Sequence, residues 1–235
     1  MAIISGVDQP LVSVIVPVRD GARFLGAALE SIFAQTHPAL DVVVVDDGSQ
    51  DATGDVARAF PAARYVARPA SGLAATRNAG LAEARGELIS FLDHDDLWPA
   101  HKTAAQVAAL AADPGAAFAV AHLENFLEPG CARPEWLKPD ALGVPQLAYS
   151  TGTLLARRSM FDVLGTFDTS YTVGDDTDWF ARAQAAGMRA VVLPEVLLRR
   201  RVHDRNHTTE TLGECAPTVM RLLKAKLDRA RRAGR

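Results

Sequence analysis

The sequence is poor in cysteine, which bears on two classes of site. Its 235 residues include two cysteines, Cys131 and Cys215, which lie far apart and belong to no CxxC pair. This spacing predicts neither a zinc site nor a disulfide framework. It is compatible with a reducing compartment such as the cytoplasm.

Long apolar runs and an excess of charge of one sign are also missing. No stretch approaches the ~18 uninterrupted apolar residues that a membrane-spanning helix needs. Residues 1–8 carry no basic region of the kind that begins a signal peptide. The net charge of −3 at pH 7 gives no general basicity, so we expect no nucleic-acid partner. Together these features predict a cytoplasmic protein.

The first half alternates β-branched apolar runs with amphipathic segments. Continuous apolar strands separated by helices are typical of a parallel sheet covered on both faces, so we predict an α/β fold. Ligands of such sheets collect at the carboxyl ends of the strands. The expected strands are 12–16, 42–45, 65–66 and 88–92, and the expected helices are 21–35, 51–60, 72–84 and 99–112.

The second half is less regular. Residues 124–149 contain four prolines and two glycines and predict a long loop, of the kind that often serves as a binding loop or lid. The last segment is amphipathic and basic, so residues 212–235 either pack on the domain or lie on anionic lipid as a peripheral membrane contact, at the inner face of the membrane. Other expected elements are strands at 117–120, 148–155, 190–193 and 196–202 and a helix at 175–186.

Asp93, Asp95 and Asp96 surround His94 directly after the apolar run 88–92. Their carboxylates repel one another and cannot bind a phosphate directly. A divalent cation removes both conflicts, because Mg²⁺ and Mn²⁺ bind carboxylate oxygens and leave positions for phosphate oxygens. The cluster therefore suggests a metal–diphosphate site. The alternative is an aspartate-rich turn that caps the following helix.

Other polar residues suggest chemistry more weakly. Asp46 ends the second expected strand, where a carboxylate can accept from the imide N–H of uracil. Arg77 can bind two phosphate oxygens. Asp176 can serve as a general base because the neighbouring Asp175 raises its pKa, and His203 can ligate a metal or donate to a phosphate. The alternatives are helix caps, a surface arginine and a structural histidine.

The order of these signals is more specific than any one of them. The chain contains, in this order, Asp46-Asp47-Gly48-Ser49, Arg77-Asn78, Phe91-Leu92-Asp93-His94-Asp95-Asp96, Gly174-Asp175-Asp176-Thr177-Asp178-Trp179 and Arg201-Val202-His203. This series resembles the family 2 glycosyltransferases, which have the GT-A fold. The resemblance implies a Rossmann-like, mostly parallel mixed sheet flanked by helices. It also implies a single domain, with a nucleotide-sugar half at 11–122, an acceptor half at 123–207 and a C-terminal amphipathic helix at 208–235.

The resemblance also implies roles for individual residues. Asp46 matches the residue that binds the base, Asp93 the residue that contacts the ribose or the metal, and Asp95 the metal ligand. Asp176 matches the base that acts on the acceptor hydroxyl, and His203 matches a histidine near the diphosphate and metal. The other donor-side positions are Pro17, Val18, Arg19, Arg77 and His94, and the acceptor-side positions are Asp175 and Trp179.

The implied reaction moves a sugar from a nucleotide-diphosphate sugar, by family habit a UDP-sugar, to an acceptor hydroxyl with inversion. The implied cofactor is Mn²⁺ or Mg²⁺. The acceptor is unspecified and ranges from a glycan, a lipid-linked sugar or a peptide to a small molecule. Two departures stand out: Arg19-Asp20 replaces a common Tyr-Asn pair, and Asp175 replaces a glutamate.

Two alternatives belong to other functional classes. A haloacid-dehalogenase-like phosphatase would use Asp93 as its nucleophile and residues 174–178 as a metal motif. In that family, however, the nucleophile strand comes early and a threonine stands where this chain has Leu97. The second alternative is an inactive module that binds a nucleotide sugar.

Overall fold

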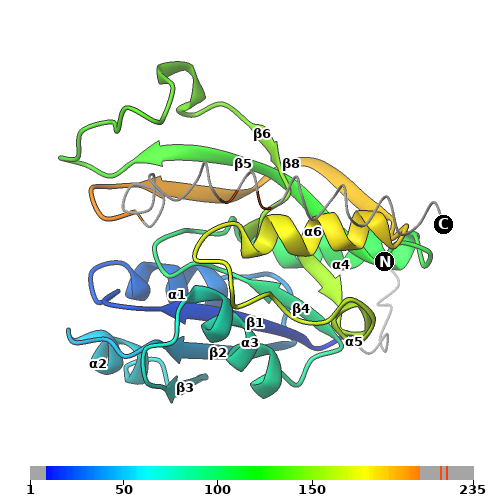
Figure 1. Ribbon diagram of the computed structural model, residues 1–235, viewed down its shortest axis with the longest axis horizontal. Coiled ribbons are helices and arrows are strands. Elements are labelled where there is room, and N and C mark those ends of the chain that lie inside the picture. Colours follow the sequence, from blue (N-terminus) through cyan, green and yellow to red (C-terminus); the bar gives the residue numbers. More distant parts are fainter. Residues whose placement is uncertain (1–8, 207–217, 219–220, 222–235) are drawn as a thin grey trace, which may run out of the picture.

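A mixed sheet of eight strands organises the protein in a computed structural model that describes residues 9–206, Thr218 and Arg221. The strand order is β3-β2-β1-β4-β7-β5-β6, and β8 pairs with β5 outside this path (Figure 1). The strands are β1 (Val12–Val18), β2 (Leu40–Asp46), β3 (Ala63–Ala67), β4 (Leu88–Phe91), β5 (Phe118–Leu127), β6 (Gln146–Ala148), β7 (Leu155–Arg157) and β8 (Ala190–Val202).

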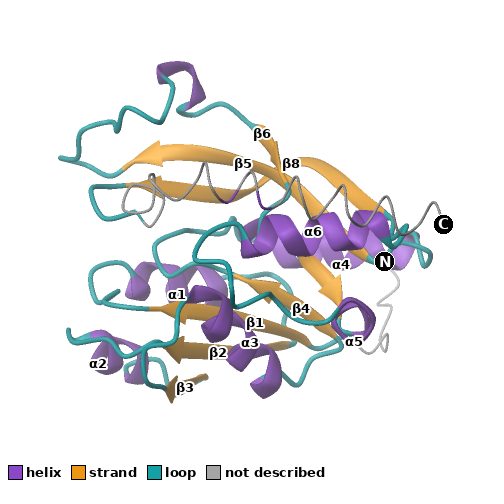
Figure 2. Ribbon diagram, in the orientation of Figure 1, coloured by secondary structure: helices purple, strands orange, loops and turns teal. Residues whose placement is uncertain are grey.

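Helices cover both faces of the sheet, as Figure 2 shows. One hydrophobic core lies under α1, α2 and α4, and the other under α3, α5 and α6. The helices are α1 (Leu25–Phe33), α2 (Thr53–Arg58), α3 (Leu73–Glu83), α4 (Lys102–Ala112), α5 (Ser159–Leu164) and α6 (Asp175–Ala185), and two short 3₁₀ turns are η1 (Pro139–Ala141) and η2 (Thr151–Thr153).

Strand β1 shows why this arrangement forms. All seven of its residues are buried, and successive side chains point to opposite faces. Val14 and Val16 therefore belong to the core under α1, whereas Ile15 belongs to the core under α3. The predicted α/β fold, with its sheet mostly parallel in the core and helices on both faces, is confirmed.

Strand β4 joins the two halves of the sheet. It pairs in parallel with β1 and antiparallel with β7, where Ser90 lies opposite Leu155. Because β7 runs the other way, the turn η2 that precedes it lies next to the carboxyl end of β4. The acidic cluster after β4 therefore has β1 and β2 on one side and segments of the second half on the other.

The second half departs from the expected elements in four places. The expected loop at 124–149 begins with the end of β5 and includes β6 and η1, and α5 was not expected. The strand expected at 148–155 is interrupted by η2, with β6 before it and β7 after it. The strands expected at 190–193 and 196–202 form one strand, β8. Its Pro194 lies opposite a register irregularity between Val120 and His122, and such irregularities accommodate a proline that cannot donate to the ladder.

The predicted C-terminal helix at 208–235, and with it the membrane contact, lies outside the described residues apart from two positions. One of these, Arg221, donates to the backbone carbonyl of Ser170 at 3.0 Å and lies over the ring of Tyr171. None of the helices that the structure describes is long and apolar enough to span a bilayer.

Two helical glycines provide a test of the packing between α3 and the sheet. A Cβ on Gly80 would lie 2.3 Å from Cγ2 of Ile15, whereas a Cβ on Gly26 would meet one atom, at 3.8 Å. We expect Gly80→Ala to lower the free energy of unfolding by about 1–3 kcal/mol through overpacking. The control Gly26→Ala should raise it by up to about 1 kcal/mol through helix propensity. Urea denaturation measures both, and equal effects would contradict the close contact of α3 with β1.

Candidate functional site

A cavity of about 1660 Å³ opens at the carboxyl ends of β1, β2 and β4. Ten of the twelve predicted site residues line it: Pro17, Val18, Arg19, Arg77, Asp93, His94, Asp95, Asp175, Asp176 and His203. They come from both halves of the chain. The shared crevice expected from the strand-end positions is therefore present.

Arg77 on α3 connects the two acidic parts of the cavity. Its guanidinium is 2.9 Å from Oδ2 of Asp175 and 3.1 Å from Oδ1 of Asp93. Burial by itself would lower the pKa of Arg77, but Asp175 and Asp93 raise it above its ordinary value. The arginine is therefore a permanent buried cation that joins the end of β4 to the start of α6.

Asp95 and His203 meet on the wall of the cavity, although they lie more than a hundred residues apart. Nε2 of His203 is 3.0 Å from Oδ2 of Asp95, and Nδ1 of the same ring accepts from the backbone N–H of Arg205. The proton is thus assigned to Nε2, which donates to Asp95. Burial alone would raise the pKa of Asp95, but the hydrogen bond from His203 and the nearby His94 lower it to about 2.

This pair has the right chemistry for part of a metal site. Within residues 9–206, no three His, Cys, Asp or Glu side chains are close enough to hold a cation among themselves. Magnesium-type sites often take only one or two carboxylates from the protein and fill the remaining positions with substrate phosphate oxygens and water. The carboxylate of Asp95 and the imidazole of His203 fit such a site when the ring proton moves from Nε2 to Nδ1. This shift frees Nε2 as a ligand and gives up the hydrogen bond from the backbone N–H of Arg205.

The turn that carries Asp95 is hydrogen-bonded to β8. Oδ1 of the buried Asp96 accepts from the backbone N–H of Arg201 at 2.8 Å, and Nε of Arg201 donates to the carbonyl of Asp95 at 2.8 Å. Burial, with the charges of Asp95 and Asp93, raises the pKa of Asp96 well above its ordinary value. Asp96 therefore shapes the turn by hydrogen bonding to the backbone of β8.

Asp176 lies at the first turn of α6, next to the ion pair of Asp175 with Arg77. Burial raises its pKa, the Arg77 charge opposes this shift, and Asp175 adds to it. Its Oδ1 accepts from the backbone N–H of Thr177 at 2.7 Å. A carboxylate with a raised pKa at a cavity wall is suited to accept a proton from a substrate hydroxyl.

Asp46, expected to bind the base, is buried and is not among the residues that line the cavity. Oδ2 accepts from the hydroxyl of Tyr65 at 2.5 Å, and Oδ1 accepts from the backbone N–H of Ser49 at 2.8 Å. Burial and the bond to Asp46 raise the pKa of Tyr65 to about 12. The next residue, Asp47, lines the cavity and accepts from the backbone N–H groups of Ser71 and Gly72. We therefore place Asp47 in the candidate site.

Trp179 also lies elsewhere than expected. Its side chain is fully buried in the core under α6, stacked on Phe161 with ring centroids 4.9 Å apart. It cannot contact an acceptor in the cavity.

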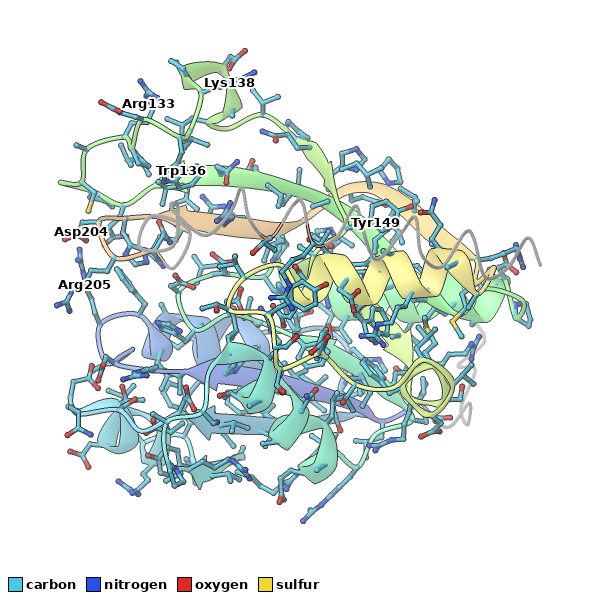
Figure 3. The ribbon with its side chains drawn as sticks, in the orientation of Figure 1. Arg133, Trp136, Lys138, Tyr149, Asp204 and Arg205 are labelled. Atoms are coloured by element: carbon cyan, nitrogen blue, oxygen red, sulfur yellow. The ribbon has the colours of Figure 1, made fainter. Side chains whose placement is uncertain are left out.

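The expected lid at 124–149 contributes no residue to the cavity lining. In Figure 3 the part of this segment that carries Arg133, Trp136 and Lys138 lies beyond β5, whereas Asp204 and Arg205 follow β8 at the cavity. Sequence reasoning also missed Asn206, whose amide donates to Oδ2 of Asp95 at 3.3 Å. Its proximity to His203 in the sequence is the one signal that points to it.

The double ion pair of Arg77 leads to a stability prediction. Arg77→Met leaves Asp175 buried without its cation, so we expect the free energy of unfolding to fall by about 3–5 kcal/mol. The matched control is Arg189→Met, which removes an exposed pair with Asp113 and should cost about 0–1 kcal/mol. Urea denaturation at pH 7 measures both. A loss for Arg77→Met no larger than that of the control would show that this bridge does not stabilise the fold.

Comparison with known proteins gives the family and the fold of this chain. The family model described as Glycosyl transferase family 2 matches residues 13–166. An uncharacterized glycosyltransferase of Rickettsia typhi is 29% identical over 219 residues, which cover 88% of this chain and 68% of that relative.

Two solved structures show the same fold. TarS of S. aureus, solved with UDP-GlcNAc, has a TM-score of 0.69 at 21% identity, over 85% of this chain and 60% of that chain. The mannosyltransferase PcManGT of Pyrobaculum calidifontis, solved with GDP-Man and Mn²⁺, has a TM-score of 0.63 at 28% identity, over 86% and 60%. The chain thus spans about three fifths of these solved chains.

The GT-A-type fold is therefore confirmed, and the phosphatase alternative loses its basis. Because the family match over residues 13–166 covers more than half of the chain, this chain belongs to glycosyl transferase family 2 and is a glycosyltransferase.

Proposed function

We propose that the protein transfers a sugar from a nucleotide-diphosphate sugar to an acceptor hydroxyl, with inversion and with a divalent cation. One observation carries the proposal. The Asp95–His203 pair and Asp176 line the same cavity, and Arg77 connects their supporting segments. The complex of PcManGT with GDP-Man and Mn²⁺, at 28% identity, supports both the donor class and the cation.

The donor side is formed by the ends of β1 and β2. Pro17, Val18, Arg19 and Asp47 line this part of the cavity. A carboxylate such as Asp47 can accept from the N–H of a uracil or a guanine, whereas the corresponding ring nitrogen of cytosine is an acceptor. We therefore propose a UDP-sugar as the first candidate and a GDP-sugar as the second. The nucleoside diphosphates alone can test this order.

Asp95 and His203 hold the cation, with the turn around Asp93 and His94 beside them. When bound, Mn²⁺ or Mg²⁺ neutralises charge that grows on the departing nucleoside diphosphate. The low pKa of Asp95 keeps this ligand ionised at neutral pH. Arg77 compensates the neighbouring Asp93 and Asp175, so that these carboxylates do not repel the diphosphate.

Asp176 acts on the acceptor. It removes the proton from the acceptor hydroxyl as the oxygen attacks the anomeric carbon and the bond to the diphosphate breaks. One base is sufficient for this single displacement, which inverts the configuration. Asp175 is bound to Arg77 at 2.9 Å, which favours a positioning role for it over that of a nucleophile. The acceptor, whose identity is not assigned, contacts the half of the cavity that residues 123–207 contribute.

The assignment of Asp176 is tested by Asp176→Asn. We expect nucleoside diphosphate binding to change little and the rate of sugar transfer to fall by about 10²–10⁴-fold, the usual contribution of a general base. The matched control is Asp178→Asn on the same helix, where the carboxylate pairs with Arg182 outside this cavity. Near-normal transfer by Asp176→Asn would remove Asp176 from the role, and failure of the wild type to turn over any nucleotide sugar would favour an inactive binding module.

The cation assignment is tested by Asp95→Ala. Wild-type protein should show higher thermal stability with UDP or GDP plus Mn²⁺ than with nucleotide alone, because a ligand of the folded state raises apparent stability by RT ln(1 + [L]/Kd). In Asp95→Ala the added effect of Mn²⁺ should disappear. Calorimetry with and without EDTA gives the affinities, and unchanged Mn²⁺-dependent affinity in the variant would contradict the assignment.

A further inference from the structure

Lys102, the first residue of α4, is buried in a way that is unusual for a lysine. Its side chain is fully buried, and no ion pair among the described residues includes it. Nζ is 2.5 Å from Oγ of Ser90, 3.4 Å from the carbonyl of Leu154 and 3.7 Å from the ring centroid of Trp98. Burial lowers the pKa of Lys102 well below its ordinary value. Nζ therefore serves as a hydrogen-bond donor inside the protein.

The contacts of Lys102 belong to a larger pattern on the turn η2. Nε1 of Trp98 donates to the carbonyl of Gly152 at 2.9 Å, and the amide of Gln106 donates to the carbonyl of Thr153 at 2.7 Å. Lys102 and Ser90 both contact the next carbonyl, that of Leu154. Three consecutive backbone carbonyls are thus bound by side chains from one segment of the chain. We call Trp98, Lys102 and Gln106 the carbonyl clamp.

The turn held by the carbonyl clamp forms part of the cavity wall. Ser150, Thr151 and Gly152 line the cavity together with Asp175 and Asp176. They lie beside the carboxyl end of β4, because β7 follows the turn and runs antiparallel to β4. The donor-side residues lie on the other side of β4, at the ends of β1 and β2. The turn is therefore on the acceptor side of the acidic cluster.

The turn is also fixed from the side of β8. A Cβ on Gly152 would lie 2.7 Å from Cδ2 of Leu198, so the backbone of the turn packs directly on this strand. Leu198 itself lines the cavity. The position of the wall is thus set by hydrogen bonds from α4 and its preceding loop on one side and by close packing on the other.

An apolar side chain would fill the space of Lys102 without the cost of burying an amine. Buried hydrogen bonds from side chains to backbone carbonyls fix the positions of those carbonyls. Lys102 is therefore suited to a role in which the position of the turn η2 is important.

We propose that Lys102, with Trp98 and Gln106, is a positioning residue for the acceptor: the carbonyl clamp holds η2 as the acceptor-side wall opposite the donor subsite. This inference rests on the proposed function, because it assumes that an acceptor occupies the part of the cavity next to Asp176. It assigns no catalytic step to Lys102. The clamp acts through the backbone of residues 152–154 and leaves the nucleotide subsite unaffected.

The test compares Lys102→Met with Thr103→Val in the full chain. Thr103 is the neighbouring residue on α4, equally buried, and its hydroxyl makes no hydrogen bond within the described part of the chain, so it is a matched control. Nucleotide affinity is measured by calorimetry with UDP and Mn²⁺, and donor hydrolysis by UDP release with water as acceptor. Transfer is measured with para-nitrophenyl monosaccharides, using the one that the wild-type protein accepts best.

For Lys102→Met we expect the KM for the sugar acceptor to rise about tenfold, the effect of losing one hydrogen bond of ordinary strength. The nucleotide Kd, the donor KM and the hydrolysis rate should stay close to the wild-type values. Thr103→Val should leave all four quantities unchanged. A rise of donor and acceptor KM together, or no rise in the acceptor KM, would overturn the proposal.

Hydrogen exchange separates this proposal from the proposed function. Amides of residues 150–156 should exchange faster in Lys102→Met than in the wild type or Thr103→Val, and unchanged protection would overturn the clamp whether or not the protein is active. Trp98→Phe keeps Lys102 and removes one donor, so it should reproduce both effects if Lys102→Met fails to fold. Absence of any turnover by the wild type, with the exchange difference present, would count against the proposed function and would leave the clamp as a scaffold of the wall.

Discussion

The buried guanidinium of Arg77 is the interaction on which the site depends. It lies between Asp93, which follows β4, and Asp175, which begins α6. Without this cation, several carboxylates would meet at one end of the sheet with no compensating charge, and burial of unpaired charge is expensive. The ion pairs also connect segments that are about a hundred residues apart, so that the position of α6 and of Asp176 depends on α3.

Other carboxylates around the cavity are also compensated by partners within the protein. Asp95 is paired with His203, Asp96 with the backbone of β8, and Asp47 with the backbone at Ser71 and Gly72. Each carboxylate of this group therefore has a partner in the protein, and the pairs hold strand ends and loops in place. A nucleotide sugar would meet a surface whose polar groups are already oriented. Such preorganisation is how a site stabilises charge that develops during a reaction.

The fold brings together residues that differ in how easily they can be recognised. The acidic cluster after β4, Arg77 and Asp176 stand in motifs whose order resembles a known family, and the structure places all of them on one cavity. Asp46 and Asp47 are adjacent carboxylates, and the pattern gave no means of choosing between them. The structure separates them, because Asp47 lines the cavity, whereas Asp46 does not and accepts from the hydroxyl of Tyr65 on the neighbouring strand β3. The burial of Lys102 could not be predicted from the sequence, because a lysine at the start of a helix is ordinarily exposed.

The sequence by itself determined the alternation of strands and helices, because apolar periodicity is a local property of the chain. It also determined which strands end in carboxylates and therefore where a ligand would bind. The tertiary structure decided which carboxylate faces the cavity, that Trp179 is a core residue, and that β8 is one strand. It also decided that the turn at 151–153 forms a wall of the site. These features depend on contacts between segments far apart in the chain, and such contacts leave no periodic signal in the sequence.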